Sequence, residues 1–525
     1  MRYHEWYKDT DADSYKASDC GKDAGFNEKL AYNLISFCAN GPSNSDFTRS
    51  FGDRYKHDIH DAYTADKKRN TGNRSHDDVK NTLGLSALTE QRFGYRYGEI
   101  LNIIVASSHS CLEYVGCFLD TAHISHACNE TVDLTLIAVP AKIVPQVVSE
   151  CVQKKVHGVI IISSGFSEVG NYQLEDEIKE HVKGSRTRIL GPNTMGYKNA
   201  SDNLDASFAF GMPRKGNLAL VSQSGALGIG MIYLANNEFV GLSKIVGVGN
   251  KLDIDDDDLI DYFSQDPETK VIGLYIEGVK DGRGFMNSIK ACHKPVLVVK
   301  AGRSLAGARA TASHTGSMAG SDEIYDAAIK QAGGIRCRDV VELFDMARAL
   351  AGQPPAQGNR IGIITNGGGL GILLTDACVA NGLTIPKLSP KTYKKIDKIL
   401  PDLIKPNNPV DLSADAGFYR YEACTRALLE DPNIDGIVVA SVHAGYARPR
   451  EYTGAILKMI RERKLHEEYK KPILGFWVGG KEFEDLVLDL KAARVPIYPS
   501  SWRTARAMLA LYLEGKRIKR EQQKQ

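Results

Sequence analysis

Two stretches of this chain decide its fold: NLALVSQSGALGIG at residues 217–230 and RIGIITNGGGLGIL at residues 360–373. Each begins with a short apolar run, passes through a turn of small or polar residues and continues with helix-forming residues. This order predicts a buried strand that leads into a helix through an open turn. The likeness of the two stretches favours two related units, although two independent uses of a common strand-turn-helix solution would look the same.

Apolar runs of the same kind recur through the rest of the chain from about Asn102 onwards. They are LNIIVA, DLTLIAV, GVIII, RILG, VIGLYI, PVLVV, GIVVAS and PILGFWV. Most are rich in β-branched residues and are followed by Gly, Ser, Pro or Asn, as parallel strands separated by crossover helices are. We therefore expect an α/β fold with flavodoxin-like units, in which the carboxyl ends of the strands open into turns suited to ligands.

Composition divides the 525 residues into segments. Polar stretches rich in Gly and Pro at 211–217 and 352–359 read as boundaries. The expected modules are 96–212, 213–351 and 356–515, followed by a basic tail at 516–525 that we interpret as a solvated helix end. Residues 1–95 are rich in Asp, Asn, Lys, Tyr and Ser without a sustained apolar period, so we expect this segment to be poorly packed.

Bulk composition limits the class of protein. Apolar residues make up 43% and charged residues 25%, as in ordinary globular proteins, and the net charge of +2 gives no field that would recruit nucleic acid or a membrane. No apolar run is long enough to span a bilayer, and the first residues lack the apolar core of a signal peptide. We expect a cytoplasmic protein.

Cysteine and histidine do not suggest a metal site. None of the ten cysteines occurs in a CxxC pair, which fits a reducing compartment. His123, His126 and Cys128 form the one cluster that resembles a ligand set, but no second close pair accompanies it at zinc spacing. We therefore predict no bound metal ion on this chain.

The turns of the two opening stretches are candidate phosphate sites. A helix N-terminus carries unpaired N–H groups and a partial positive charge, and glycine lets an anion approach the backbone closely. The candidate residues are Ser222, Ser224 and Gly225 in the first turn, and Asn366, Gly367, Gly368 and Gly369 in the second. Taken singly, either turn could also be only a tight turn.

Between the two turns lies KAGRSLAGARATASHTGSMAGSD at residues 300–322, which has too few apolar residues for a core strand. We predict a mobile surface loop that carries His314 into an anion site. A neutral imidazole can attack phosphorus and split phosphoryl transfer into two easier steps, while helix N-termini stabilise the phosphorylated form. Glu277, at the end of the strand LYIEG, is a candidate to orient the ring.

These motifs resemble a known family. The run formed by VDLTLIAVP, SSGFSEVG, GPNTMGY, SQSGALG, GVGNKLDID, YIEGV, the SHTG segment, ITNGGGLGI, NPVDL and VPIYPSSWRTARAM is similar to the α subunit of ADP-forming acetyl-CoA synthetase, over about residues 130–515. That family is related to succinyl-CoA synthetase. The resemblance implies a Rossmann-like CoA-binding domain followed by two ligase domains, with His314 as the phosphorylated histidine and Glu277 as the carboxylate that contacts it.

The resemblance also implies the reaction and its participants. The family converts acyl-CoA, phosphate and ADP into acid, CoA and ATP through an acyl phosphate and a phosphohistidine. It implies an ATP-grasp β subunit in an α2β2 assembly, with ATP or ADP and Mg²⁺ on that partner, since this chain has no GxxxxGK[ST] loop. The matching CoA positions lie at predicted strand ends: Val139, Pro140, Ser164, Gly165, Gly191, Pro192 and Asn193.

One departure from the family keeps an alternative open. Family members begin with a strand, a Gly-containing turn and a helix that cradle CoA, but here NIIVASSHSCLEYVG lacks the early glycine, so we expect a partial CoA domain. This favours a regulatory protein that binds CoA or acyl phosphate without turnover. A nicotinamide-dependent dehydrogenase fits poorly, because NGGGLG places Ile372 where the third glycine of GxGxxG belongs.

Overall fold

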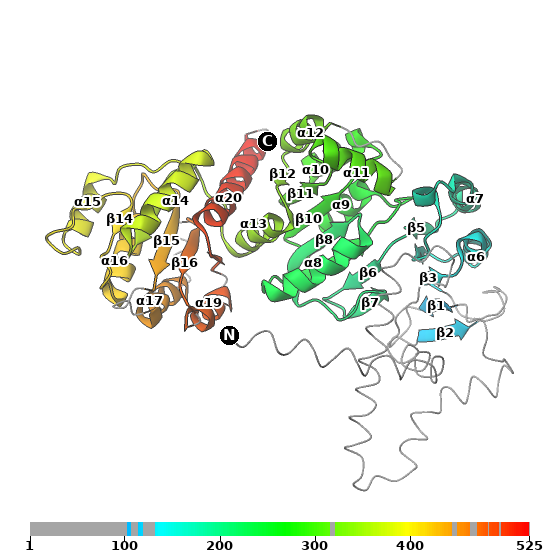
Figure 1. Cartoon of the computed structure of the whole chain (residues 1–525), viewed down its shortest axis with the longest axis horizontal. Helices are drawn as coiled ribbons and strands as arrows, with labels where there is room; N and C mark the ends of the chain where they lie inside the picture. Colours follow the sequence, from blue (N-terminus) through cyan, green and yellow to red (C-terminus); the bar gives the residue numbers. More distant parts are fainter. Residues whose placement is uncertain are drawn as a thin grey trace, which may run out of the picture. The chain divides into compact units, whose positions relative to one another are not determined.

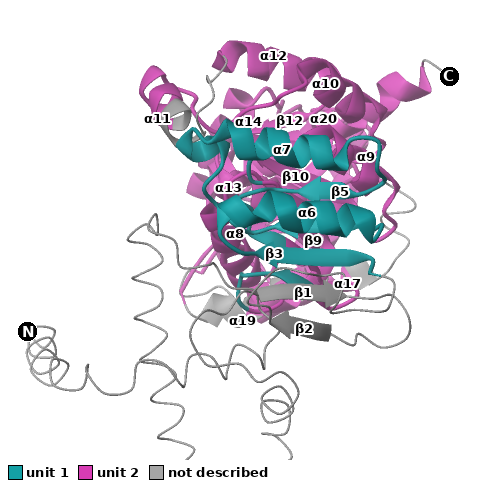
Figure 2. Cartoon of the chain, turned by 90° about the vertical axis from the view of Figure 1, so that its right-hand side faces the viewer, with its two compact units in different colours: residues 1–196, 205–210, 249–253 teal, residues 197–204, 211–248, 254–525 magenta. Residues whose placement is uncertain are grey.

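The computed structural model describes residues 102–106, 114–118, 132–315, 321–443, 449–461, 470–480, 482–492 and 495–523. The chain forms two compact units: residues 1–196, 205–210 and 249–253 make unit 1, and residues 197–204, 211–248 and 254–525 make unit 2 (Figure 2). The predictions for residues 1–95 and for His123, His126 and Cys128 lie outside the described residues.

Unit 1 contains a five-stranded sheet in the order β2-β1-β3-β4-β5. Its strands are β1 (Asn102–Ala106), β2 (Tyr114–Phe118), β3 (Leu134–Ala138), β4 (Gly158–Ile161) and β5 (Arg188–Leu190). Its helices are η1 (Ala141–Ile143), α6 (Val144–Gln153), η2 (Ser167–Val169) and α7 (Tyr172–Val182). Strands β3, β4 and β5 are parallel, and valine and isoleucine side chains from them and from the helices form one buried cluster. This half matches the predicted Rossmann-like pattern.

The prediction that LNIIVA is a parallel strand is wrong. β1 runs antiparallel to both β2 and β3, with Ile104 opposite Gly116 on one side and opposite Leu136 on the other. Only residues 107–113 separate β1 from β2, and a parallel crossover needs about a dozen residues. The connection is therefore too short for a parallel crossover, which accounts for the antiparallel pairing of β1 with β2.

The second region of the fold contains a seven-stranded sheet in the order β12-β11-β10-β8-β9-β6-β7. Its strands are β6 (Gly196–Asn199), β7 (Leu204–Ser207), β8 (Lys215–Ser222), β9 (Leu242–Gly247), β10 (Val271–Ile276), β11 (Val296–Lys300) and β12 (Ile335–Cys337). Its helices are α8 (Gly225–Asn237), α9 (Asp256–Gln265), α10 (Gly282–Ala291), α11 (Leu305–Thr315), α12 (Asp322–Ala332) and α13 (Val340–Gly352). The five strands from β12 to β9 are parallel, and β6 is antiparallel to β9.

The third region of the fold contains a parallel sheet in the order β14-β13-β15-β16-β17. Its strands are β13 (Ile361–Thr365), β14 (Val410–Asp411), β15 (Gly436–Val442), β16 (Ile473–Val478) and β17 (Ile497–Tyr498). Its helices are α14 (Gly368–Ala380), α15 (Pro390–Asp397), α16 (Phe418–Leu429), α17 (Pro449–Arg461), α19 (Glu482–Ala492) and α20 (Ser501–Gln522). One buried cluster joins the sheet to α14 and α20, and another joins its opposite face to α16, α17 and α19 (Figure 1). Because both faces are covered, the strands are apolar throughout.

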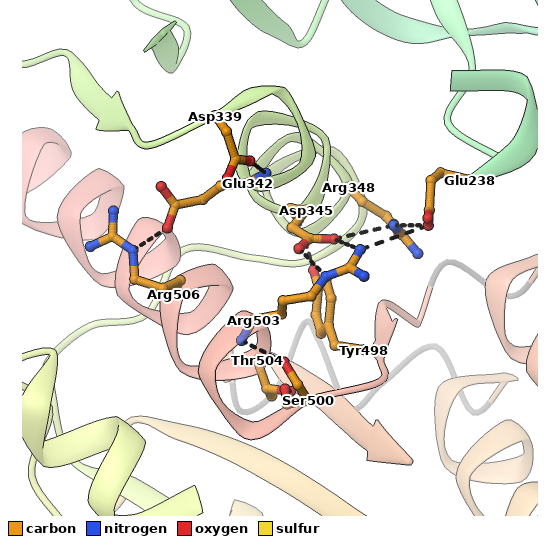
Figure 3. A network of polar contacts seen from close by, with 10 residues as sticks. All are labelled: Glu238, Asp339, Glu342, Asp345, Arg348, Tyr498, Ser500, Arg503, Thr504 and Arg506. Atoms are coloured by element: carbon orange, nitrogen blue, oxygen red, sulfur yellow. Dashed lines mark hydrogen bonds and ion pairs between the residues drawn. The ribbon is translucent and has the colours of Figure 1, made fainter. Parts of the chain in front are cut away.

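A polar network joins the second and third regions inside unit 2 (Figure 3). Asp345 on α13 is buried, and its two carboxylate oxygens accept hydrogen bonds from Arg503 on α20 at 2.6 and 2.8 Å. Arg348 donates to Glu238, the residue that ends α8, at 3.0 Å, and the Tyr498 hydroxyl donates to the Asp345 carbonyl at 2.8 Å. The buried carboxylate is thus paired and hydrogen-bonded, as burial of a charge requires.

The basic tail differs in part from the expected solvated helix end. Helix α20 continues to Gln522, as a helix end should, but Arg517 is mostly covered rather than solvated. It pairs with Glu514 and Glu521 and donates to the carbonyl of His293 at 2.9 Å. Within the described ranges, no helix has both the length and the apolar character needed to cross a membrane.

Candidate functional site

The first predicted phosphate turn joins β8 to α8. The Ser222 hydroxyl donates to the Ser224 carbonyl at 2.7 Å, and Ser224 caps the helix by accepting a hydrogen bond from the Leu227 amide at 3.4 Å. Gly225 is the first helical residue. The N–H groups of the first turn that precede Leu227 have no acceptor within the helix, so they remain suited to an anion.

Glu277 lies directly beside this turn. Strands β8 and β10 are parallel neighbours, with Ser222 opposite Tyr275. Gln223 completes the link: its amide donates to the Tyr275 carbonyl at 3.0 Å, and its side-chain oxygen accepts from the Glu277 and Gly278 amides at 2.7 and 3.1 Å. The structure therefore brings two predicted features, the serine turn and the Glu277 carboxylate, to one edge of one sheet.

Tyr275 adds a hydroxyl to the Glu277 carboxylate. Its Oη lies 3.5 Å from Oε1 of Glu277, which makes this a long hydrogen bond. Burial raises the pKa of Tyr275 to about 12, and the neighbouring Glu277 charge adds to the shift. Tyr275 therefore keeps its proton at neutral pH and acts as a donor to Glu277.

Sequence reasoning overlooked Lys300, a buried cation on the next strand of the same edge. Lys300 ends β11 opposite Ile276, is 2% exposed, and lies with its Nζ 4.6 Å from the centroid of the Tyr325 ring. Burial lowers the pKa of Lys300, and the nearby charge of Arg336 lowers it further. The signal was available, because a lysine at the end of the apolar run VLVVK is a charge that the chain buries at a strand end.

Arg336 on β12 is the second buried cation near this edge. Its Nη2 lies 2.5 Å from Oδ1 of Asp322, at the start of α12. Nε and Nη1 of Arg336 are also buried, and neither has a hydrogen-bond partner among the residues that the structure describes. Two buried cations, Lys300 and Arg336, therefore lie near the edge that holds Glu277, where they can attract an anionic ligand.

The structure corrects the predicted loop around His314. Residues Leu305–Thr315 form helix α11, with His314 in its last turn. Ser304 starts the helix: its hydroxyl accepts from the Gly307 amide at 3.0 Å and its carbonyl accepts from the Ala308 amide at 2.7 Å. Alanine, leucine and arginine have high helix propensity, so a lack of large apolar residues did not mean a loop. The His314 side chain and residues 316–320 lie outside the described residues, and its pairing with Glu277 stays a prediction.

The second predicted phosphate turn joins β13 to α14 and is held differently. The Asn366 side chain bridges to β15, donating to the Val442 carbonyl at 3.0 Å and accepting from the Val442 amide at 2.9 Å. Gly367 is the N-cap of α14 but has no side chain with which to cap it. A side chain added at Gly369 would meet no atom within 4 Å, so the space beside it is open.

An acidic residue borders this second turn. Asp411 ends β14, the strand beside β13, and a Cβ built on Gly368 would lie 3.2 Å from its Oδ2. The two turns belong to different sheets. Whether they act on one phosphoryl group stays a prediction.

The predicted CoA positions gather at one edge of the unit 1 sheet. They follow the carboxyl ends of three adjacent parallel strands: Val139 and Pro140 after β3, Ser164 and Gly165 after β4, and Gly191, Pro192 and Asn193 after β5. Val139 is buried, and its carbonyl accepts a hydrogen bond from the Ser163 hydroxyl. Pro140 and Ser164 are exposed at the edge and fit a ligand-contacting role.

Two of these positions need glycine. Gly191 has a φ of +104°, and a Cβ there would lie 2.7 Å from the Ile161 carbonyl. Gly165 has a φ of +109°, but its amide is already used: it donates to Oε1 of Glu168 at 2.5 Å, and the Phe166 amide also donates to this carboxylate at 3.2 Å. An internal carboxylate therefore occupies amides that an anionic ligand would otherwise bind.

Comparisons with known proteins identify the family. Three family models match: the CoA binding domain over residues 113–165, the succinyl-CoA ligase like flavodoxin domain over residues 215–350 and the ligase-CoA domain over residues 361–518. The α subunit of ADP-forming acetate–CoA ligase I of Pyrococcus furiosus is 42% identical over 393 residues, which is 73% of this chain and 83% of that protein. The chain belongs to the ADP-forming acetate–CoA ligase family.

Other members of this ligase family match comparably. The α subunit of the second P. furiosus enzyme is 40% identical over 74% of this chain and 85% of its own length. A solved structure from Candidatus Korarchaeum cryptofilum, described as a dinucleotide forming acetyl-coenzyme A synthetase 1 in complex with phosphate and ADP, has a TM-score of 0.72 and 37% identity, covering 76% of this chain and 86% of that one. The predicted family and fold class are thereby confirmed.

Proposed function

We propose that this chain is the α-type subunit of a ligase that interconverts acyl-CoA, phosphate and ADP with a carboxylic acid, CoA and ATP. The observation that carries the proposal is the edge formed by β8, β10 and β11. There a helix N-terminus, a buried carboxylate at Glu277 and a buried cation at Lys300 lie on adjacent strands of one parallel sheet. Such an edge suits a phosphoryl group and the imidazole that carries it.

The proposed chemistry has three steps. Phosphate attacks the thioester carbon of acyl-CoA, so CoA leaves and acyl phosphate forms. An imidazole nitrogen of His314 then attacks phosphorus, the acid leaves and the phosphoryl group is held as phosphohistidine. Finally the phosphoryl group moves to ADP, which gives ATP and regenerates the histidine.

We assign roles to the described residues within this scheme. Glu277 accepts the imidazole N–H and favours the reactive tautomer, while Lys300 offsets the charge of the phosphoryl group. Ser222, Ser224 and Gly225 form one phosphate cradle, and Asn366 with Gly367, Gly368 and Gly369 forms the other. The acid is proposed only as a class, because a 34% identical relative in Nitrosopumilus maritimus is named for 4-hydroxybutyrate rather than acetate.

CoA is assigned to the carboxyl edge of the unit 1 sheet. Pro140 and Ser164, exposed after β3 and β4, would line the ligand, while Gly191 and Asn193 shape the loop after β5. Because Glu168 holds the amides of Gly165 and Phe166, we do not assign a CoA phosphate to them. Gly165 instead provides the positive φ with which the loop turns, so that the Glu168 carboxylate accepts from the Gly165 amide.

A partner subunit completes the proposed enzyme. The P. furiosus relatives are named as α subunits, and the ADP-forming acetate–CoA ligase of Methanocaldococcus jannaschii is 40% identical over only 54% of its length. We propose that an ATP-grasp β subunit supplies the remaining function, with ADP or ATP and Mg²⁺ bound to it, in an α2β2 assembly. This assignment agrees with the lack of a GxxxxGK[ST] loop in the present sequence.

A non-catalytic regulatory protein is the second candidate function. It is favoured by the antiparallel hairpin of β1 and β2, which stands where the family has a CoA-cradling strand, turn and helix. The buried Glu277 and Lys300 favour catalysis, because they lie at the carboxyl ends of adjacent strands, where buried charges cluster at functional sites.

Turnover of His314→Asn tests the proposal. The full chain is combined with its β partner, acyl-CoA, phosphate and ADP, and ATP formation is followed. Asparagine cannot carry the phosphoryl group, so we expect net turnover to vanish while the thermal unfolding temperature stays unchanged. Wild-type turnover by this variant would reject the covalent mechanism, and binding of acyl-CoA without any turnover by the wild type would favour the regulatory candidate.

A further inference from the structure

The segment GNKLD at 249–253 belongs to a different unit from the elements on either side of it. In sequence it lies between β9 and α9, yet it is part of unit 1. There the Asn250 amide donates to the Pro192 carbonyl, and the Leu252 amide to the Gly191 carbonyl, both at 2.9 Å. The segment therefore lies backbone to backbone along the loop that follows β5.

Both ends of this segment are fixed within unit 1. Gly249 has a φ of +55°, and a Cβ there would lie 2.2 Å from the Pro192 carbonyl oxygen, so only glycine allows the approach. At the other end, Asp253 accepts hydrogen bonds from the Arg188 side chain at 2.9 Å and from the Ile189 amide at 2.8 Å. Residues 249–253 therefore pack specifically against β5 and the loop that follows it.

The Asn250 side chain joins the loops after β4 and β5. Its amide nitrogen donates to Oε2 of Glu168 at 2.6 Å and to Oε1 of Glu175 at 2.9 Å, and it lies 3.1 Å from the Ser167 hydroxyl. Its amide oxygen accepts from the Asn193 side chain at 3.3 Å. One residue thus contacts groups 57 to 83 positions away in the sequence.

The chemistry of these contacts explains why an amide is needed. Glu168 and Glu175 bring two carboxylates to one nitrogen, and only a donor can lie between them. Glu175 is 6% exposed, and it also accepts from the amide and hydroxyl of Ser167 at 3.2 and 2.6 Å. Because Glu168 in turn holds the Gly165 amide, the loop after β4 keeps its shape through Asn250.

We propose that Asn250 is a positioning residue for CoA, which holds the loops after β4 and β5 in the arrangement that the ligand requires. The inference rests on the proposed function, because it takes this edge as the CoA site. It assigns to Asn250 no contact with reacting atoms. The residue acts through Glu168 and Asn193, whose loops carry the candidate CoA positions.

Calorimetric titration of CoA into the full-length chain tests the proposal. We expect Asn250→Ala to weaken CoA binding about tenfold, because hydrogen bonds to charged groups are lost and two carboxylates are left facing each other. Asn250→Asp adds a third carboxylate and should weaken binding more. Adding Glu168→Gln to Asn250→Asp restores a donor opposite a carboxylate and should recover part of the loss.

Matched controls separate positioning from general damage. Gln173→Ala changes an exposed amide of α7 that donates to Glu177 at 3.1 Å, and CoA binding should stay unchanged. Labelling of His314 by ATP and the β partner needs no CoA, so it should stay within about twofold of wild type in Asn250→Ala. Unchanged CoA affinity in Asn250→Ala would overturn the inference, as would an equal loss of CoA binding and labelling. Failure of the wild-type chain to bind CoA would instead overturn the proposed function.

Discussion

The two strand-turn-helix units of the ligase regions look alike in sequence but are fastened in different ways. In the turn between β8 and α8, two side chains stabilise the backbone. Ser224 caps the helix, and Gln223 binds the backbone of Glu277 on the neighbouring strand. In the turn between β13 and α14, Asn366 fixes β15, and Gly367 leaves the helix without a side-chain cap. Both turns thus hydrogen-bond to an adjacent strand, but only the second lacks a side-chain cap at the start of its helix.

This difference suggests a division of labour. We propose that the first turn belongs to the catalytic edge, because Gln223 holds the backbone of the buried Glu277. The second turn offers open space beside Gly369, into which an anion can move close to the backbone. The following substitutions test this division from the largest expected effect to the smallest.

Glu277→Gln should remove the carboxylate while leaving its setting intact. Gln223 binds the Glu277 backbone amide, a contact that the substitution keeps. Loss of a group that orients an imidazole should lower kcat by about 10–100-fold without changing the unfolding temperature. Turnover with the β partner and a thermal melt measure the two quantities. A kcat within twofold of wild type would remove Glu277 from the proposed mechanism.

Gly369→Ala should separate stability from activity in the second turn. A methyl group there meets no protein atom, and alanine favours a helix by up to about 1 kcal/mol over glycine. We expect a slightly more stable protein whose turnover falls at least about tenfold, because the methyl displaces the phosphate.

Gly230→Ala in α8 is the matched control. Its added methyl group also meets nothing within 4 Å, but it lies away from the helix start. The same small gain in stability should come without loss of turnover. Equal turnover for the two glycine variants would show that the open space beside Gly369 has no catalytic use.

Ser224→Ala should have a modest effect on stability. Removing an N-cap hydroxyl costs about 1 kcal/mol of folding free energy, and Ser224→Thr, which keeps the hydroxyl, should cost less. Urea unfolding curves measure both. The glycine turn has no such side-chain bond to lose at Gly367. If Ser224→Ala unfolds at the wild-type urea concentration, the first turn is not held by this cap.

Much of the fold could be predicted because its strands are short, apolar and followed by turn residues. The serine turn and Glu277 could be expected to meet, since carboxyl ends of parallel strands share an edge. The strand LSKIVG was overlooked because Lys244 interrupts its apolar pattern. In the fold Lys244 is buried and paired with Asp266 at 2.8 Å, a partner 22 residues away that no local pattern reveals.

Other features depend on the same kind of distant partner. β1 pairs antiparallel with both β2 and β3, a direction that the apolar composition of LNIIVA does not reveal. The helix around His314 depends on the Ser304 cap and on small residues that we read as a loop. The role of Asn250 could not be inferred, because its contacts come from the loops after β4 and β5.

Detection of phosphate on His314 tests the central claim most directly. The full chain is incubated with ATP and the β partner, or with acyl-CoA and phosphate, and is digested and analysed by mass spectrometry under alkaline conditions that preserve phosphohistidine. The account predicts a phosphoryl group on His314 in the wild type and none at this position in His314→Asn. Turnover of acyl-CoA to ATP by a wild-type chain that never carries phosphate on His314 would contradict it.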